Sequence, residues 1–314
     1  MESIERGSAG SARVAIVGGI HGDEPAGERI VRRLADELDE RGSGSGSVRL
    51  IVANEPALAA GTRYTDADLN RVFPGDPDSG DYERALAPRL AAELEGMDAV
   101  LALHTSHSAP PPFAIYSDPT ESVRRSVTGM PVEYVVDSSR LRSTTLDSVV
   151  PHTVSIEVGR QGSEEAVEYG YEACLAFLRA HGALDDDPPT FTETTIVAGD
   201  EEVPKGGGEP HVHFRNFEEI PEGAVFAEDD VYTHRVEEEG VVPILASERG
   251  YEEIFGIYGR VQGTMTPPAS DGDGTTGGEE STERGSTAEG SAETRSTERG
   301  STAEGSAEET AEQP

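Results

Sequence analysis

Gly18-Gly19-Ile20-His21-Gly22-Asp23-Glu24 lies directly after the apolar residues 12–17 and directly before a helical pattern that begins at Pro25. The apolar run predicts a buried strand, and Pro25 favours the first position of a helix. A His and a Glu three residues apart at such a turn point in the same direction and can bind one zinc ion together. The run therefore predicts a strand, a turn with two metal ligands, and a helix.

Alternating patterns on both sides of this turn predict the fold class. Up to residue 183, short apolar runs alternate with helical patterns, which is typical of a mostly parallel or mixed sheet covered by helices. The expected strands are residues 13–17, 48–53, 99–103, 113–116, 132–136 and 154–158, and the expected helices are residues 25–40, 82–94 and 164–179.

After residue 188 the pattern changes to short β-like pieces separated by Gly and Pro, with no helical periodicity. These pieces predict a small β-rich second domain. The expected organisation is a flexible N-terminus over residues 1–10, an α/β domain over residues 11–187 and the β-rich domain over residues 190–262.

A repeat defines the C-terminal tail. Residues 281–293 read STERGSTAEGSAE, and residues 296–308 repeat these letters. From residue 270 onward alanine is the only aliphatic side chain, so burial of apolar surface cannot offset the entropy lost on ordering. We expect a disordered, acidic, low-complexity tail over residues 268–314.

Acidic residues dominate the composition. The chain has 61 Asp and Glu against 25 Lys and Arg, a net charge of -36, and Lys205 is its only lysine. Such a surface is typical of a halophilic protein, because concentrated salt screens the repulsion between carboxylates. The acidic residues are spread along the chain, which disfavours a dedicated cationic partner, and their sign disfavours binding to nucleic acid.

Cysteine content and hydropathy bear on the compartment. Cys174 is the only cysteine, which excludes an internal disulfide and a thiolate zinc cluster. Residues 1–10 are polar and lack the apolar core of a signal peptide, and no run reaches the ~18 apolar residues of a membrane span. We therefore expect a cytoplasmic protein that does not contact a membrane.

His104 is the best candidate for the third ligand that a hydrolytic zinc ion needs. Residues 99–103 read as a buried strand that delivers His104 to the strand end, where α/β sheets place their sites. A histidine that closes an apolar strand is also compatible with a structural role. The pairing with His21 and Glu24 favours a ligand.

The polar segment Asn54 to Gly75 follows a predicted strand and has no amphipathic period, which predicts a long loop at the same sheet edge. Arg63, Asn70 and Arg71 on this loop suit a carboxylate, and also the oxyanion that develops on a scissile carbonyl. The alternative is a salt-bridged surface loop.

Glu157 lies inside an otherwise apolar predicted strand. A carboxylate there is costly unless it has a partner or a chemical role. Near a zinc-activated water it is placed to take a proton from the water and pass it to a leaving nitrogen. The alternative is an ion pair with a nearby arginine.

Four motifs in order give the sequence a family resemblance. It resembles the succinylglutamate desuccinylase/aspartoacylase family of zinc amidohydrolases, which is related to the zinc carboxypeptidases. The resemblance covers roughly residues 14–261 and implies a carboxypeptidase-like α/β domain, with a mixed sheet flanked by helices, followed by a small β domain that caps the site. The motifs are His21-Gly22-Asp23-Glu24, DLNRVFPG at residues 68–75, Leu103-His104-Thr105 and Ile156-Glu157-Val158-Gly159.

The resemblance also implies roles for single residues. It implies one zinc ion per chain on His21, Glu24 and His104, with Glu157 as general base and acid. For the substrate, it implies a carbonyl-polarising Arg63, a carboxylate site made by Asn70 and Arg71, and a substrate-facing Tyr251 from the second domain.

The sequence departs from the family pattern at two places. Ala102 stands where the family usually has an Asp two residues before the third ligand, and such partners orient metal-binding histidines. The arginine expected upstream of Glu157 to bind a second substrate carboxylate has two candidates, Arg140 and Arg142. His211 and His213 alternate on one predicted strand, which we interpret as exposed.

Three functional hypotheses follow. The leading one is a zinc-dependent deacylase that hydrolyses the amide of a small N-acylated amino acid or a related compound. The second is a zinc carboxypeptidase that acts on peptides, and a β domain closing over the site disfavours it. The third is a non-catalytic, degenerate member of the family that acts as a binding protein, which Ala102 favours and Glu157 opposes.

Overall fold

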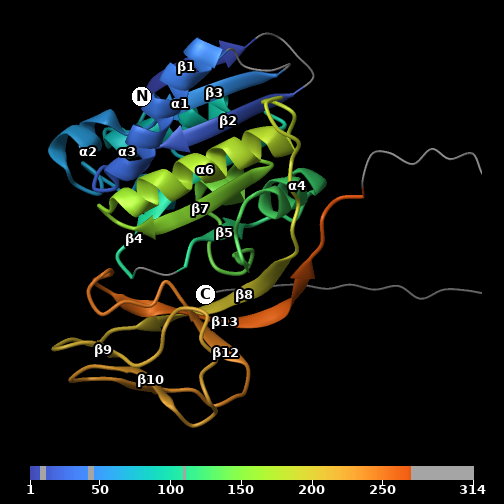
Figure 1. Cartoon of the computed structure of the whole chain (residues 1–314). Coiled ribbons are helices and arrows are strands. Elements are labelled where there is room, and N and C mark those ends of the chain that lie inside the picture. The colour runs from blue at the N-terminus through green and yellow to red at the C-terminus, as the bar shows by residue number, and fades with distance from the viewer. Residues whose placement is uncertain (8–11, 42–45, 109–110, 270–314) are drawn as a thin grey trace, which may run out of the picture. The chain divides into compact units, whose positions relative to one another are not determined.

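Ten strands form the central sheet of the computed structural model, which describes residues 1–7, 12–41, 46–108 and 111–269 (Figure 1). Their order across the sheet is β1-β3-β2-β4-β7-β5-β6-β8-β13-β12. These strands are β1 (Glu2–Gly7), β2 (Arg13–Gly18), β3 (Ser47–Val52), β4 (Ala99–Ser106), β5 (Phe113–Tyr116), β6 (Tyr134–Asp137), β7 (Thr153–Arg160), β8 (Thr194–Pro204), β12 (Val241–Ile244) and β13 (Ile254–Met265).

The middle of the sheet is parallel, because β3, β2, β4 and β7 all run in the same direction. β5 pairs antiparallel with β7 and parallel with β6, so the sheet is mixed. All eight residues of β4 are buried, as expected for a strand covered on both faces. The mixed α/β sheet predicted from the alternating patterns is therefore confirmed.

Helices cover both faces of the sheet, as the alternation of side chains in β2 illustrates. Val14 and Ile16 pack into a cluster with α1 (Pro25–Arg41), α4 (Glu121–Gly129) and α6 (Glu164–Ala180). Figure 1 shows α1 and α6 lying across the strands on that face. Ala15 and Val17 pack on the opposite face, together with side chains of α3 (Tyr82–Glu93) and α5 (Leu146–Val149).

Two sequence-based expectations for this region were wrong. The predicted flexible N-terminus contains β1, which pairs antiparallel with β3. Its residues alternate between half-buried and exposed, and Ile4 packs against the core. The segment predicted as one long loop contains α2 (Glu55–Ala60) and a 3-10 turn, η1 (Leu69–Arg71). Both elements are too short to give a helical period, and each begins at a side-chain cap.

The strands predicted after residue 190 divide between two sheets. β8, β13 and β12 extend the central sheet, and β8 pairs parallel with β6. A separate three-stranded sheet contains β9 (His211–Val212), β10 (Val225–Glu228) and β11 (Thr233–Arg235) in the order β11-β10-β9. The described part of residues 1–269 forms one compact unit. The division between residues 187 and 190 stays a prediction.

From residue 270 onward, the tail lies outside the residues that the structure describes, so its disorder stays a prediction. Among the residues that are described, no helix is long and apolar enough to cross a membrane.

Candidate functional site: a buried His-Glu-His cluster

Two glycines shape the turn that carries the first two candidate ligands. Gly19 has a φ of +66°, and a Cβ at Gly22 would lie 2.0 Å from the backbone of Ala57. Only glycine fits both positions, and the turn places His21 and Glu24 at the carboxyl end of β2. Both residues are buried, with 3% and 5% exposure.

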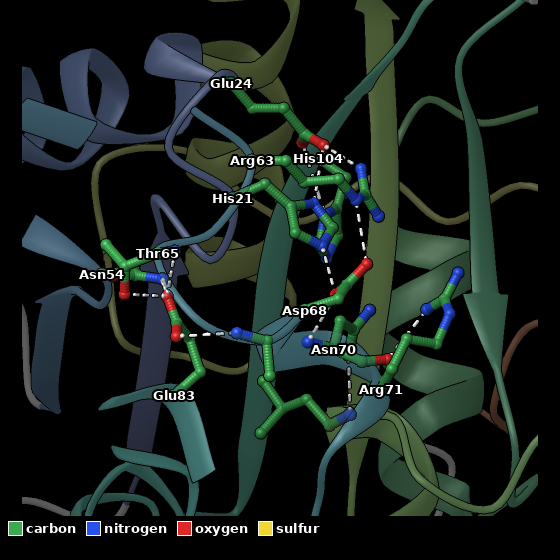
Figure 2. A network of polar contacts seen from close by, with 12 residues as sticks. His21, Glu24, Asn54, Arg63, Thr65, Asp68, Asn70, Arg71, Glu83 and His104 are labelled. Carbon is green, nitrogen blue, oxygen red and sulfur yellow. Dashed lines mark hydrogen bonds and ion pairs between the residues drawn. The ribbon is translucent and has the colours of Figure 1, made fainter. Parts of the chain in front are cut away.

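His104 joins this pair from the end of the neighbouring strand β4. The candidate ligand atoms of His21, Glu24 and His104 all lie within 4.8 Å of one another. His21 Nδ1 is 2.7 Å from one oxygen of Glu24, and His104 Nδ1 is 3.4 Å from the other. Figure 2 shows the Glu24 carboxylate facing both imidazole rings. The structure thus brings together the three ligands predicted from the sequence.

The chemistry of this cluster fits a divalent metal ion. Two imidazoles and one carboxylate form a donor set of catalytic zinc sites. Burial opposes the charged form of His21, but Glu24 and Asp68 raise its pKa to about 9. The buried carboxylates therefore stabilise the protonated, cationic imidazole. Burial likewise opposes ionisation of Glu24, yet the neighbouring imidazoles hold its pKa well below the usual range. A site that retains one positive charge in this way suits a metal cation.

Glu157 lies next to the cluster on β7, where it is paired in register with His104. The carboxylate is buried, and its Oε2 has no hydrogen-bond partner among the described residues. Burial raises the pKa of Glu157 to about 8, and the charge of Glu24 adds to the shift. The ion pair considered as an alternative is absent among the described residues, so Glu157 is available for proton transfer.

Asp68, the first residue of the DLNRVFPG motif, had no predicted role and links the cluster to the arginine loop. Its Oδ1 lies 3.2 Å from His21 Nε2, and its Oδ2 accepts a hydrogen bond of 2.9 Å from Arg63 Nε (Figure 2). Burial opposes ionisation of Asp68, but His21 and Arg63 hold its pKa well below the usual range. Its position between Arg63 and Arg71, together with its suitability as a helix cap, could have indicated this role from the sequence.

Asn70 and Arg71 lie on η1 at the edge of the same pocket. Asn70 is held in place because its Oδ1 accepts a hydrogen bond of 2.9 Å from the backbone N–H of Leu146. Arg71 donates to the carbonyl of Asn70 and has no carboxylate partner within the described part of the chain. Burial lowers the pKa of Arg71; the charge of Asp68 opposes this shift, and the charges of Arg142 and Arg63 add to it. An anionic ligand would give this buried cation a direct partner.

Tyr251 lines the pocket from the segment between β12 and β13. Burial raises its pKa above the usual range, and the carboxylate of Glu157 adds to the shift. Apolar side chains of the same region also line the pocket, namely Ile244, Leu245, Ile254 and Ile257.

Of the other arginines and histidines considered in the sequence, some line the pocket and some lie at the surface. Arg142 and His107 line the pocket, and Arg142 forms an ion pair with Glu202. Arg140 is 68% exposed in its side chain and lies 3.8 Å from Asp200, so it is not a free pocket cation. His211 and His213 do not line the pocket; they lie on and beside β9 and approach surface glutamates.

Fold and site together define a class: an α/β protein with a candidate two-histidine, one-carboxylate metal centre at the carboxyl edge of its sheet. Residues 11–179 match the succinylglutamate desuccinylase/aspartoacylase catalytic domain, and the chain belongs to this family.

Similar proteins agree with this membership. N-acyl-aromatic-L-amino acid amidohydrolase (carboxylate-forming) B from Danio rerio is 29% identical over 171 residues, which cover 47% of this chain and 54% of the relative. N-alpha-acetyl-L-2,4-diaminobutyric acid deacetylase from Halomonas elongata is 30% identical over 176 residues, 51% of each chain. The chain thus spans about half the length of these curated relatives.

The fold has solved counterparts as well. A succinylglutamate desuccinylase/aspartoacylase from Rhodobacter sphaeroides superimposes with a TM-score of 0.63 at 22% identity, covering 80% of this chain and 86% of that one. At this level of identity the likeness concerns the fold.

Proposed function

We propose that the chain is a zinc-dependent deacylase that hydrolyses the amide bond of a small N-acylated amino acid. The observation that carries the proposal is the buried His21, Glu24 and His104 cluster beside an unpartnered Glu157 carboxylate. The names of similar proteins support amide hydrolysis, and their substrates include N-acyl aromatic amino acids and an acetylated diamino acid.

In the proposed reaction, side chains of the protein transfer the proton and stabilise the charge that develops on the substrate. Zinc, when bound, polarises the acyl carbonyl and lowers the pKa of water toward ~7. Glu157 accepts the proton of the attacking water at its free Oε2 and delivers it to the leaving nitrogen, a role that suits a pKa near 8. Arg63, held by Asp68, stabilises negative charge on the carbonyl oxygen.

Residues that line the pocket orient the substrate in the proposed reaction. The unpaired guanidinium of Arg71, beside Asn70, binds the substrate carboxylate. Tyr251 and the apolar side chains near β12 and β13 line one side of the pocket, and a wall at this side favours a small substrate over a peptide.

Metal content and turnover test the proposal directly. Protein purified in molar KCl should contain one zinc ion per chain, and His104→Ala should lose it. Wild type should hydrolyse members of a panel of N-acyl amino acids. Glu157→Gln should retain zinc but lose roughly 10²- to 10⁴-fold in kcat. Glu165→Gln, a matched change at an exposed position, should behave as wild type. Turnover that survives Glu157→Gln contradicts the assigned proton transfer.

A non-catalytic binding protein is the second candidate, and one observation favours it. His104 Nε2 is buried without a partner in the described residues, and Ala102, two residues earlier on the same strand, offers no carboxylate. Protein that lacks zinc, or that binds zinc without turning over any member of the panel, would support this candidate over the deacylase.

A further inference from the structure

Asp147 is a buried carboxylate in the pocket that the proposed reaction does not use. It lies on α5, is 8% exposed and lines the same pocket as Glu157 and Arg71. Buried carboxylates normally have a cationic partner or a metal, because an uncompensated charge is costly inside a protein. Asp147 has no cationic partner among the described residues.

Three hydroxyl groups surround the carboxylate of Asp147, and all are neutral. Its Oδ2 lies 2.7 Å from Ser117 Oγ and 3.3 Å from Ser138 Oγ, and its Oδ1 lies 3.3 Å from Ser155 Oγ. Ser138 Oγ also lies 2.9 Å from the carbonyl of Tyr116, so its single proton is shared. The hydroxyls orient the carboxylate but leave its charge uncompensated.

Neither arginine that was predicted to bind a second substrate carboxylate balances this charge. Arg142 lines the pocket but is neutralised by Glu202, and Arg140 lies at the surface beside Asp200. Among the described residues that line the pocket, Arg71 and Asp147 therefore both lack an oppositely charged partner, as does the candidate catalytic carboxylate of Glu157.

The segments that carry Arg71 and Asp147 pack directly on each other. Asn70, the neighbour of Arg71, accepts a hydrogen bond from the backbone N–H of Leu146, the neighbour of Asp147. Ser155, which contacts Asp147, precedes Glu157 by two positions on β7, and same-face residues two apart on a strand lie about 7 Å from each other. Asp147 thus contacts the strand face that carries the candidate catalytic carboxylate, and both residues line the same pocket.

We propose that Asp147 selects N-acyl amino acids whose side chain ends in a cationic amine. The substrate α-carboxylate binds Arg71, the amide lies at the His-Glu-His cluster and Glu157, and the side-chain ammonium donates to Asp147. The inference rests on the proposed deacylase function and specifies its substrate class. A purely structural role, in which Asp147 only ties the serines together, is the competing explanation.

Paired substrates of equal size test the selection. Wild type should hydrolyse Nα-acetyl-L-2,4-diaminobutyrate with a kcat/KM roughly 10- to 100-fold above that for Nα-acetyl-L-norvaline, because a charge-assisted hydrogen bond is at stake. N-acetyl-L-aspartate should be the poorest of the three. Asp147→Asn, which keeps the shape and the hydroxyl contacts, should reduce the ratio between the first two substrates at least tenfold.

Ser117→Ala is the matched control, because it removes a hydroxyl contact and leaves the charge. It should keep the preference for the cationic substrate, whereas a structural role predicts that both variants change alike. A wild-type ratio near one, or a ratio that Asp147→Asn leaves intact, overturns the inference while the deacylase stands.

Binding separates the inference from the proposed function. If no substrate is hydrolysed, the proposed deacylase function is wrong. Calorimetry with Glu157→Gln then measures whether the protein still binds the cationic ligand in preference to the neutral one. Binding of the acetylated diaminobutyrate over the norvaline derivative, lost on adding Asp147→Asn, supports the inference. Equal or absent binding of both ligands overturns it.

Discussion

His104 shows how one residue links the candidate metal site to its support. Its Nδ1 faces Glu24, while its Nε2 is buried and unpartnered in the described structure. Metal-binding histidines usually donate their second ring N–H to a carboxylate or carbonyl, which fixes the ring and the tautomer. Ala102 lies two residues earlier on the same face of β4 and offers no acceptor there.

Ala102→Asp should supply this missing partner. We expect the variant to bind zinc about 10-fold more tightly than wild type, because a carboxylate on Nε2 orients His104 and makes it more basic. Competition with a chromophoric chelator measures the affinity. Because position 102 is fully buried, a thermal melt must show that the variant is folded. Ala102→Asn is the control for charge. Unchanged zinc affinity in folded Ala102→Asp would show that His104 needs no such support.

Residues at strand ends were predictable from sequence, whereas residues whose role depends on distant packing were not. His21, Glu24, His104 and Glu157 each follow or interrupt an apolar run, so the sheet edge brings them together. Asp147 lies in a short helix with no pattern of its own, and its position in the pocket depends on contacts with three other segments.

At the scale of elements, α3 holds the segment that carries the pocket arginines. Glu83 on α3 is fully buried and accepts hydrogen bonds from the backbone N–H groups of Thr65, Asp66 and Ala67. It also accepts one from Asn54 Nδ2. Figure 2 shows Thr65 and Asn54 facing the Glu83 carboxylate. The helix was predictable from its pattern, but this anchor was not, because a buried Glu in a helix gives no signal of its loop partner.

Glu83 should make stability depend on pH in a defined window. Burial opposes its ionisation, but the backbone donors lower its pKa to about 2. A folded-state pKa below the unfolded value means that the stabilisation is complete above pH 4.5 and is lost as the pH falls toward 2. Glu83→Gln should therefore lower the free energy of unfolding at pH 7 by about 3 kcal/mol and flatten its decline below pH 4.5.

Urea unfolding at pH 7, 5, 4 and 3 in constant salt measures this difference. Glu95→Gln, at an exposed position just after α3, is the control and should follow wild type at every pH. Parallel curves for wild type and Glu83→Gln would show that the anchoring carboxylate contributes no differential ionisation.

Net charge acts at the scale of the whole molecule. The tail from residue 270 holds 12 acidic residues and three arginines, so -9 of the -36 lies there and -27 on the rest of the chain. Surface ion pairs between α1 and α6, such as Arg29 with Glu164 and Arg33 with Glu168, offset only part of this excess. Exposed pairs of this kind contribute little each, so repulsion between unpaired carboxylates should dominate the long-range electrostatics.

Salt should therefore stabilise the protein by screening, and the effect should depend on net charge. We expect the melting temperature at pH 7 to rise by several degrees between 0.1 and 1 M KCl, as the Debye length falls from about 10 Å to about 3 Å, and then to level off. Near the sequence pI of about 4.4 the repulsion is absent, and the same titration should have little effect. Differential scanning calorimetry at both pH values measures the two increments. Equal increments would mean that KCl acts through hydration of apolar surface rather than through the acidic charge.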